Sequence, residues 1–258
     1  MKRYSIVLSS ILIAACGGCS PDLSGINIGG GPIAWPDEAV GGAWVGTDSG
    51  GNQILALVTE SGRLNWISLD TGEQGFGTVS VQWITTTIEY TLVAPWGFTL
   101  ADGSTSATCG GVGHIVKRVS WHAPINCTTS LGGSIESLTD FTYDALYDRD
   151  SSLALIAGDY DDSGLVISVS ANGEIFEQDP ASGCVVNGQI SIIDSQFNVY
   201  DVSITYSNCT GDEAVLNGAV FAGLGILDDT VVPETLIFGV TGVVGNETYS
   251  VVSALPRL

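Results

Sequence analysis

The chain contains two histidines, His114 and His122, at the two ends of the stretch HIVKRVSWH. Polar and apolar residues alternate along this stretch, which predicts one continuous β-strand. At about 3.3 Å per residue, the two imidazoles would lie roughly 26 Å apart, too far to share a metal ion. Two interpretations remain for the polar face: an anion-binding stripe of His114, Arg118 and His122, or a solvent-exposed face that pairs with nearby carboxylates.

The stretch DYDDSG, residues 159–164, has the spacing of the first half of a calcium-binding loop. Asp159, Asp161 and Ser163 stand at positions one, three and five, where such loops place oxygen ligands. Position twelve is Ser170 rather than the bidentate glutamate that completes the loop. The pattern leaves two interpretations, a weak surface calcium site or an acidic hairpin turn, and we predict no other metal site.

A third candidate is the acidic stretch DFTYDALYDRD, residues 140–150. If it is one strand, four carboxylates share a face: Asp140, Asp144, Asp148 and Asp150. A glycosidase needs two carboxyl groups with different pKa values, and nothing in this pattern raises the pKa of one of them. The sequence also lacks the motifs of serine hydrolases, zinc proteases, P-loops and dinucleotide sites. We therefore predict no catalytic residues, no enzymatic activity and no dissociable cofactor.

The first cysteine, Cys16, follows Ile13-Ala14-Ala15 after a basic start and a short apolar stretch. That stretch is shorter than the roughly 20 residues that a membrane-spanning helix needs. The arrangement resembles the bacterial lipobox. The resemblance implies that residues 1–15 are a signal peptide and that Cys16 carries a diacylglycerol and an N-acyl chain such as palmitate. Since Gly17 rather than aspartate follows, it also implies the outer membrane, on either its periplasmic or its surface face.

Four further cysteines suggest disulfides, because exported proteins oxidise paired thiols. We predict the pairs Cys109–Cys127 and Cys184–Cys209, which leaves Cys19 as the odd thiol. The stretch QISIIDSQFNVYDVSITY reads as a hairpin that pairs Ile190 with Val202. In that register Cys184 faces Asn208, so the second disulfide requires a bulge at the open end of the hairpin.

The net charge of −21, from 28 acidic and seven basic residues, limits the possible partners. Nucleic acid is excluded as a partner, and anionic lipid head groups would repel the surface. Attachment to a membrane would therefore depend on the lipid anchor. An envelope protein or a small apolar ligand remains as a partner.

Alternating polarity and turn signals predict an all-β fold, an antiparallel sandwich or barrel. The chain also repeats itself: Gly62 and Gly173 are 111 residues apart, as are Gly77 and Gly188, and IEY at 88–90 matches ITY at 204–206. We predict two related modules of about 110 residues. They cover residues 43–150 and 151–258, after a flexible Gly/Pro-rich tether at 16–42.

Gly42-Ala43-Trp44 is similar to the Gly-x-Trp of lipocalins, in which the tryptophan closes the floor of a ligand-binding barrel. The resemblance implies a calycin-like barrel for a small apolar ligand, although the C-terminal helix of that family is absent from the pattern. We expect four further tryptophans in the core: Trp66, Trp83, Trp96 and Trp121.

The stretches YDALYDRDSSLALIAGDY and GCVVNGQISIID with YSNC resemble a family of uncharacterised proteobacterial lipoproteins. The resemblance spans most of the chain after Cys16 and implies no activity. From the sequence we expect a lipid-anchored envelope protein that acts as a non-enzymatic interaction or structural module. A carrier of a small apolar ligand is the alternative.

Overall fold

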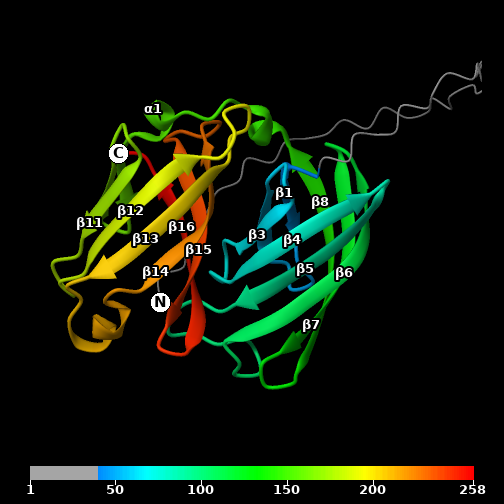
Figure 1. Cartoon of the computed structure of the whole chain (residues 1–258), viewed down its shortest axis with the longest axis horizontal. Coiled ribbons are helices and arrows are strands. Elements are labelled where there is room, and N and C mark those ends of the chain that lie inside the picture. The colour runs from blue at the N-terminus through cyan, green and yellow to red at the C-terminus, as the bar shows by residue number, and fades with distance from the viewer. Residues whose placement is uncertain (1–39) are drawn as a thin grey trace, which may run out of the picture. The chain divides into compact units, whose positions relative to one another are not determined.

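The computed structural model describes residues 40–258, apart from the side chains of Leu138 and Thr139. The predicted signal peptide, Cys16, Cys19 and nearly all of the predicted tether lie outside the described residues. The described part is dominated by antiparallel strands, which confirms the all-β class (Figure 1). None of its helices has the length and apolar composition that crossing a bilayer requires.

The first eight strands form a closed antiparallel barrel in which each strand pairs with the next and β8 returns to β1. Gly42 already belongs to β1 and Val40 is buried, so the predicted tether extends a few residues too far. The barrel strands are β1 (Gly42–Thr47), β2 (Gln53–Val58), β3 (Arg63–Ser68), β4 (Gln74–Gln82), β5 (Thr85–Val93), β6 (Ser106–Val116), β7 (Ser120–Thr129) and β8 (Ser134–Asp144).

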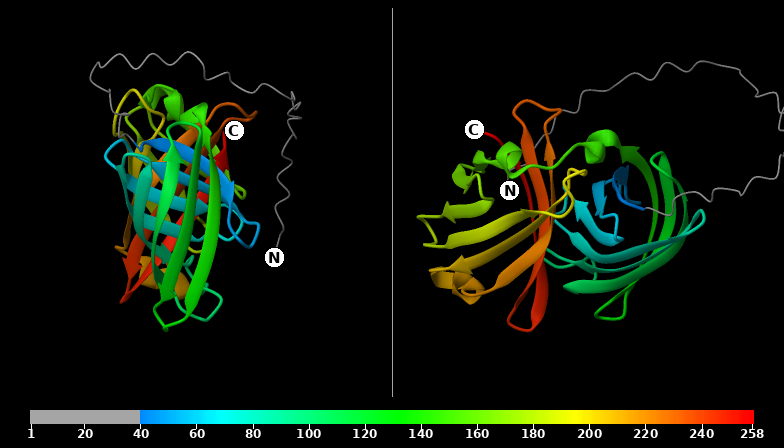
Figure 2. Two further views of the ribbon diagram at one scale, coloured as in Figure 1. Left: turned by 90° about the vertical axis from the view of Figure 1, so that its right-hand side faces the viewer. Right: turned by 45° about the horizontal axis from the view of Figure 1, so that its top comes forward.

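The remaining eight strands form a second sheet that follows chain order and curls until β9 and β16 meet at a bridge between Tyr160 and Arg257 (Figure 2). Its strands are β9 (Gly158–Asp162), β10 (Leu165–Val169), β11 (Glu174–Gln178), β12 (Val185–Ile192), β13 (Tyr200–Ser207), β14 (Val220–Asp228), β15 (Thr235–Val244) and β16 (Glu247–Pro256). The short helices η1 (Ala145–Asp148), α1 (Leu153–Ile156) and η2 (Gly211–Leu216) lie in the connections.

The predicted repeat is present in three dimensions. Gly62 and Gly173 each end a hairpin turn with a positive φ, 83° and 82°, which a residue with a side chain rarely adopts. Their carbonyl groups accept equivalent hydrogen bonds, from Val79 N to Gly62 and from Ile190 N to Gly173. The two sheets therefore begin with the same supersecondary unit, as two related modules should.

One of the predicted matches is wrong by two residues. Gly77 pairs with Tyr90 across the barrel strands, whereas Gly188 pairs with Ile204 in the second sheet. Tyr90 therefore corresponds to Ile204, and not to Tyr206 as the likeness of IEY and ITY suggested. Alternation with a period of two makes a shift by two residues invisible in the sequence, because every side chain keeps its face.

Both predicted disulfides are confirmed. Cys109 and Cys127 are directly opposed on β6 and β7, and both are buried inside the barrel. Cys184 and Cys209 form a disulfide just beyond the open end of the β12–β13 hairpin. The register of this hairpin pairs Ile190 with Val202, as predicted. Asn208 has a φ of 59°, so the backbone departs from the strand at the position where the sequence required an irregularity.

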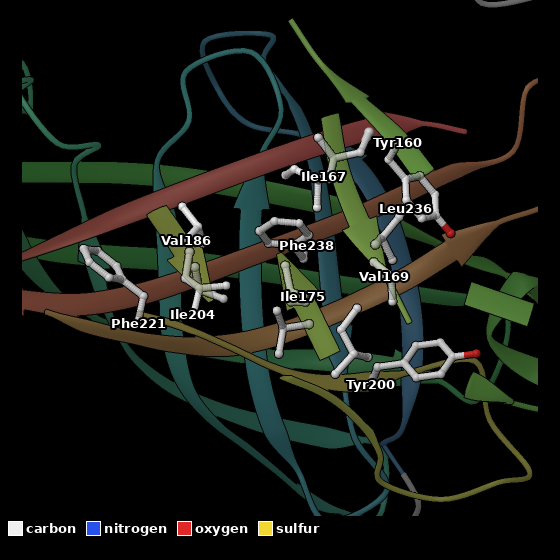
Figure 3. Close-up of a cluster of buried hydrophobic side chains, with 14 of the residues drawn as sticks. Tyr160, Ile167, Val169, Ile175, Val186, Tyr200, Ile204, Phe221, Leu236 and Phe238 are labelled. Atoms are coloured by element: carbon white, nitrogen blue, oxygen red, sulfur yellow. The ribbon is translucent and has the colours of Figure 1, made fainter. Parts of the chain in front are cut away.

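The core of the second sheet consists of apolar side chains from nearly all of its strands (Figure 3). Tyr160, Tyr200 and Phe221 are fully buried there. The core of the barrel is a separate cluster that includes Trp44, Trp121 and Phe141. Each module thus buries its own inner face, which agrees with the alternating pattern along its strands.

A third apolar cluster joins the outer face of the barrel to the second sheet. Leu55, Leu57 and Ile67 point out of the barrel and pack with Leu224 and Ile226 from β14. This contact explains why β2 reads as the continuous apolar run ILALV instead of alternating, since both of its faces are covered.

Polar contacts cross the same interface. The buried Asn65 donates from Nδ2 to the carbonyl oxygen of Gly239, at 2.7 Å. The Ser250 hydroxyl on β16 donates to the carbonyl oxygen of Gly72, at 2.9 Å, and Ser250 N donates to Ala94 O. Arg63 and Asp201 form an ion pair between the modules. These contacts fix the position of β3 and of the loops after β3 and β5 against the second sheet.

We predict that Gly239→Ala destabilises the protein by about 1–3 kcal/mol, the usual cost of overpacking a filled interior. A Cβ atom at this position would lie 2.9 Å from Ile67 Cγ1 across the interface. Gly110→Ala is the matched control, because a Cβ there meets its nearest neighbour at 3.4 Å. Urea unfolding followed by tryptophan fluorescence measures both variants, and equal stability of the two would contradict the tight contact.

Candidate functional site

The barrel is closed by aromatic side chains at the end where β1 begins. Trp44 is 1% exposed and packs edge-to-face against Trp121 and Tyr143, with ring centroids 5.8 and 5.2 Å away. Arg118 lies over the Tyr143 ring, 5.9 Å from its centroid. Trp44 thus lies at the barrel floor, as the Gly-x-Trp resemblance implied.

The middle of the barrel is also filled. Between Trp66, Tyr90, Trp121 and Phe141 there remains a cavity of about 10 Å³. A water molecule needs about 10–15 Å³ by this kind of measure, so the space holds one water at most. The barrel interior therefore offers no room for a ligand below the level of Trp66 and Tyr90.

A larger cavity of about 210 Å³ opens at the opposite end, which we call the mouth. Four loops surround the mouth: residues 48–52, 69–73, 94–105 and 130–133. The apolar part of the cavity wall consists of Trp66, Tyr90, Leu92, Leu100, Ala101, Ile135 and the disulfide-bonded Cys127. Its polar part consists of Asp48, Ser49, Glu73 and Ser137, so the wall contains no basic side chain.

The rings of Trp66 and Tyr90 provide the aromatic surface of this cavity. They are nearly parallel, with centroids 6.4 Å apart and 17° between the planes. Burial, with a smaller contribution from the charge of Glu73, raises the pKa of Tyr90. The phenol therefore stays protonated at neutral pH and keeps its hydrogen-bond donor.

Two carboxylates lie at the mouth, and they differ in how many hydrogen bonds they accept from the protein itself. Asp48 accepts hydrogen bonds from Gly50 N, Asn52 N and Asn52 Nδ2, at 2.8–2.9 Å, and so holds its own loop together. Glu73 is half-buried, and burial raises its pKa, with a hydrogen bond from Thr71 lowering it and the charge of Asp48 raising it. Glu73 is thus the carboxylate whose charge is least compensated by the protein.

This arrangement suits a small ligand with an apolar body and a positively charged or hydrogen-donating head. An enclosed apolar cavity of about 150 Å³ accommodates benzene, so 210 Å³ corresponds to a single ring with a short substituent. The aromatic wall favours an apolar or cationic group, and the carboxylates disfavour an anion.

A shallow depression of about 470 Å³ lies on the outer surface of β4, β5 and β6. Gly77 and Gly110 lack side chains there, and the remaining wall includes Thr78, Thr91 and Thr108. This depression is open to solvent and would leave most of a small ligand exposed. The mouth cavity, with buried apolar side chains around it, is the better candidate for a binding site.

The two histidines lie closer together than the sequence predicted. Residues 117–119 form a turn, in which Val119 N donates to Val116 O and Arg118 has a φ of 54°. His114 on β6 is therefore directly opposite His122 on β7, and the predicted separation of roughly 26 Å is wrong. Arg118 pairs with Asp148 at 2.6 Å, so it is not part of a stripe between the histidines.

The predicted row of four carboxylates is also interrupted. β8 ends at Asp144, whose carboxylate accepts a hydrogen bond from Leu146 N, and η1 follows immediately. Asp148 accepts a hydrogen bond from the Tyr143 hydroxyl at 2.8 Å. Asp140 and Asp148 thus lie on different elements and take part in different contacts.

Asp159 and Asp161 lie on β9, and Ser163 begins the turn to β10. Asp159 accepts a hydrogen bond from the Ser168 hydroxyl at 2.7 Å, and Asp161 accepts one from Gly164 N at 2.8 Å. These contacts hold the hairpin together, and the calcium interpretation stays a prediction without further support.

One group among residues 40–258 gathers three potential ligand atoms within 4.8 Å of one another: Cys184, Cys209 and Glu213. Both cysteines form a disulfide, so neither offers the thiolate that binds a metal ion.

The tryptophans divide between core and surface. Trp121 is 2% exposed inside the barrel, and Trp66 is partly buried there. Trp96 packs against the second sheet with its ring edge-to-face to Tyr249. Trp83 is wrongly predicted as a core residue, because it lies in the β4–β5 turn with a φ of 67° and is 60% exposed.

The residues of the mouth cavity had no signal in the sequence. Glu73 lies in the loop between β3 and β4, and the sequence presents it as an ordinary turn residue. Tyr90 lies between the polar residues Glu89 and Thr91 as any core residue of a strand would, and Trp66 lies on a strand whose two faces are both covered. Their common cavity exists because barrel closure brings β3, β5 and the mouth loops together.

The second module contains a carboxyl group that is more deeply buried than that of Glu73. Glu177 on β11 lies on the buried face of the second sheet, with Ile175, and is 8% exposed. Burial, together with the charges of Asp162 and Asp179, raises the pKa of Glu177 to about 7. The folded protein therefore holds a proton on Glu177 at pH values where the unfolded chain releases it.

We predict that Glu177→Gln stabilises the protein at pH 8 by about 2 kcal/mol and leaves its stability unchanged at pH 4. The stability of the parent protein should fall between pH 4.5 and about 7, because the folded pKa is raised. Glu174→Gln, an exposed position on the same strand, is the control. Urea denaturation at both pH values tests this, and a pH-independent difference would contradict the assignment.

Comparison with known proteins assigns no family: no protein-family model matches the sequence, and no curated protein matches it.

Proposed function

We propose that this protein is a lipid-anchored envelope protein that acts by binding rather than by catalysis, and that its barrel holds a small, largely apolar ligand at the mouth. The ligand would carry a positively charged or hydrogen-donating head directed at Glu73. The single observation that supports this proposal is the cavity of about 210 Å³ between the aromatic rings and the mouth loops.

The membrane part of the proposal is supported by the sequence around Cys16 alone. The resemblance to the lipobox favours an acylated cysteine, and two or more acyl chains would give stable anchoring. The outer membrane, on either face, is the location that this resemblance favours.

A second candidate function is an interaction or structural module of the envelope. It is supported by exposed apolar side chains at the closed end of the barrel, where Trp83 and Ile84 are each 60% exposed and Val116 and Val119 are 58% and 57% exposed. A hydrogen bond from Ile115 N to Ile84 O brings the two turns side by side. An envelope protein could dock on this surface.

We expect the mouth cavity to discriminate among ligands by the charge of the head group. Three probes share a phenyl ring and a short chain: 2-phenylethylammonium, 2-phenylethanol and 3-phenylpropionate. The ammonium should bind at least about ten-fold more tightly than the alcohol, and the carboxylate should bind most weakly, because a carboxylate beside a cavity favours a cation. Isothermal titration calorimetry at pH 7.5 measures all three.

In Glu73→Gln the preference for the ammonium should disappear while the alcohol still binds. Glu89→Gln is the matched control, since Glu89 lies on the outer depression and not at the mouth. Tighter binding of the carboxylate would contradict the proposed head group. Failure of all three probes to bind would contradict the ligand-binding function and favour the interaction module.

We also expect Ala101→Trp to block the mouth cavity. Ala101 is an exposed residue of the cavity wall, and an indole at this position would occupy part of the cavity volume. Binding of the ammonium probe should fall at least about ten-fold, with the free energy of unfolding changed by less than about 0.5 kcal/mol. Thr87→Trp, at an exposed site on the outer face of β5, is the control. Unchanged binding in Ala101→Trp would place the ligand elsewhere.

A further inference from the structure

The outer face of the barrel carries both histidines of the chain in one row across three strands. His114 on β6 is directly opposite His122 on β7, and His122 is directly opposite Asp140 on β8. All three side chains are exposed. Directly opposed residues have Cβ atoms about 4.5–5.5 Å apart, which is a spacing that lets two imidazoles reach one ion.

The contact between His122 and Asp140 prepares one of the rings for metal binding. His122 Nδ1 forms a hydrogen bond with Asp140 Oδ1. When Nδ1–H donates this hydrogen bond and the carboxylate accepts it, the lone pair of the neutral ring is on Nε2. Metal-binding histidines use this arrangement, in which a carboxylate orients the ring and increases its basicity.

The chemistry of the two rings decides which ion would bind. Neutral imidazole is a good ligand for Zn²⁺, Cu²⁺ and Ni²⁺, whereas Ca²⁺ and Mg²⁺ prefer oxygen ligands. The net charge of −21 attracts dications toward the surface in general. The ligand atoms are not gathered around one point in the structure, so metal binding would require the exposed His114 ring to turn toward His122.

From this geometry we propose that His114 and His122, with Asp140 as the positioning residue, form a surface site for one transition-metal dication of the Zn²⁺ type. The two ring nitrogens would occupy two coordination positions. The remaining positions would be open to water, to an anion or to a side chain of a binding partner. The site is independent of the mouth cavity, because neither histidine belongs to the wall of that cavity.

The test is a calorimetric titration of ZnCl₂ into the mature chain without its lipid and without a polyhistidine tag. We expect one Zn²⁺ per chain. His114→Ala and His122→Ala should each reduce the affinity at least about ten-fold, and Asp140→Asn should reduce it roughly ten-fold, as expected for loss of an orienting carboxylate. Saturating CaCl₂ should not compete.

Asp161→Asn is the matched control, since it removes one partly exposed carboxylate from a hairpin of the other module. It should change the affinity less than about two-fold. The histidine side chains are exposed, so their replacement should leave the unfolding curve unchanged, and urea denaturation verifies this. Nitrogen-15 chemical shifts of the two imidazoles give an independent readout, because only Zn²⁺-bound nitrogens should shift on titration.

Zn²⁺ binding that survives in the double variant His114→Ala/His122→Ala would overturn the proposal and indicate general attraction to the acidic surface. Absence of Zn²⁺ binding would overturn it as well. A stoichiometry of one Zn²⁺ per two chains, lost in both single variants, would support the ligands and show that the open positions are filled by a second chain.

Discussion

The rest of the structure depends on the burial of β2 and β3 on both of their faces. Ala56 and Val58 fill the barrel, while Leu55 and Leu57 on the other face contact the second sheet. The sheets approach closely because Gly239 has no side chain opposite Ile67, and Asn65 uses the short distance to bind the Gly239 carbonyl oxygen. As a result, the two modules belong to one compact unit, and the loop of Glu73 is fixed from outside the barrel.

A second constraint is the volume of the aromatic side chains inside the barrel. An eight-stranded barrel has an interior just wide enough to be filled by side chains or to hold one small ligand. Here Trp44, Trp121 and Phe141 fill the closed end, and Trp66 and Tyr90 end the filled part. The free volume is therefore confined to the mouth, where Glu73 lies. The size and the charge of the proposed ligand both follow from this division.

Much of the fold could be predicted from local patterns. Alternation predicted the strands, glycines at 62 and 173 marked equivalent turns, and the hairpin register predicted the Cys184–Cys209 pair together with its irregularity at Asn208. Errors arose where the pattern is degenerate. A shift by two residues preserves every side-chain face, which misaligned Tyr90. Asp140, Asp144 and Asp148 keep the same spacing of four although the strand ends at Asp144 and η1 follows.

The sequence by itself determined the all-β class, the repeat and the cysteine pairs, because these depend on local periodicity and spacing. Tertiary structure alone decided the mouth cavity and the histidine pair. The turn after Val116 contains three residues, an odd number, so alternation continues through it and a hairpin looks like one strand. Arg118 adopts a positive φ without the glycine or asparagine that usually signals such a turn. Pairing between β6 and β7 therefore places the two imidazoles side by side, whereas the prediction of one continuous strand separated them.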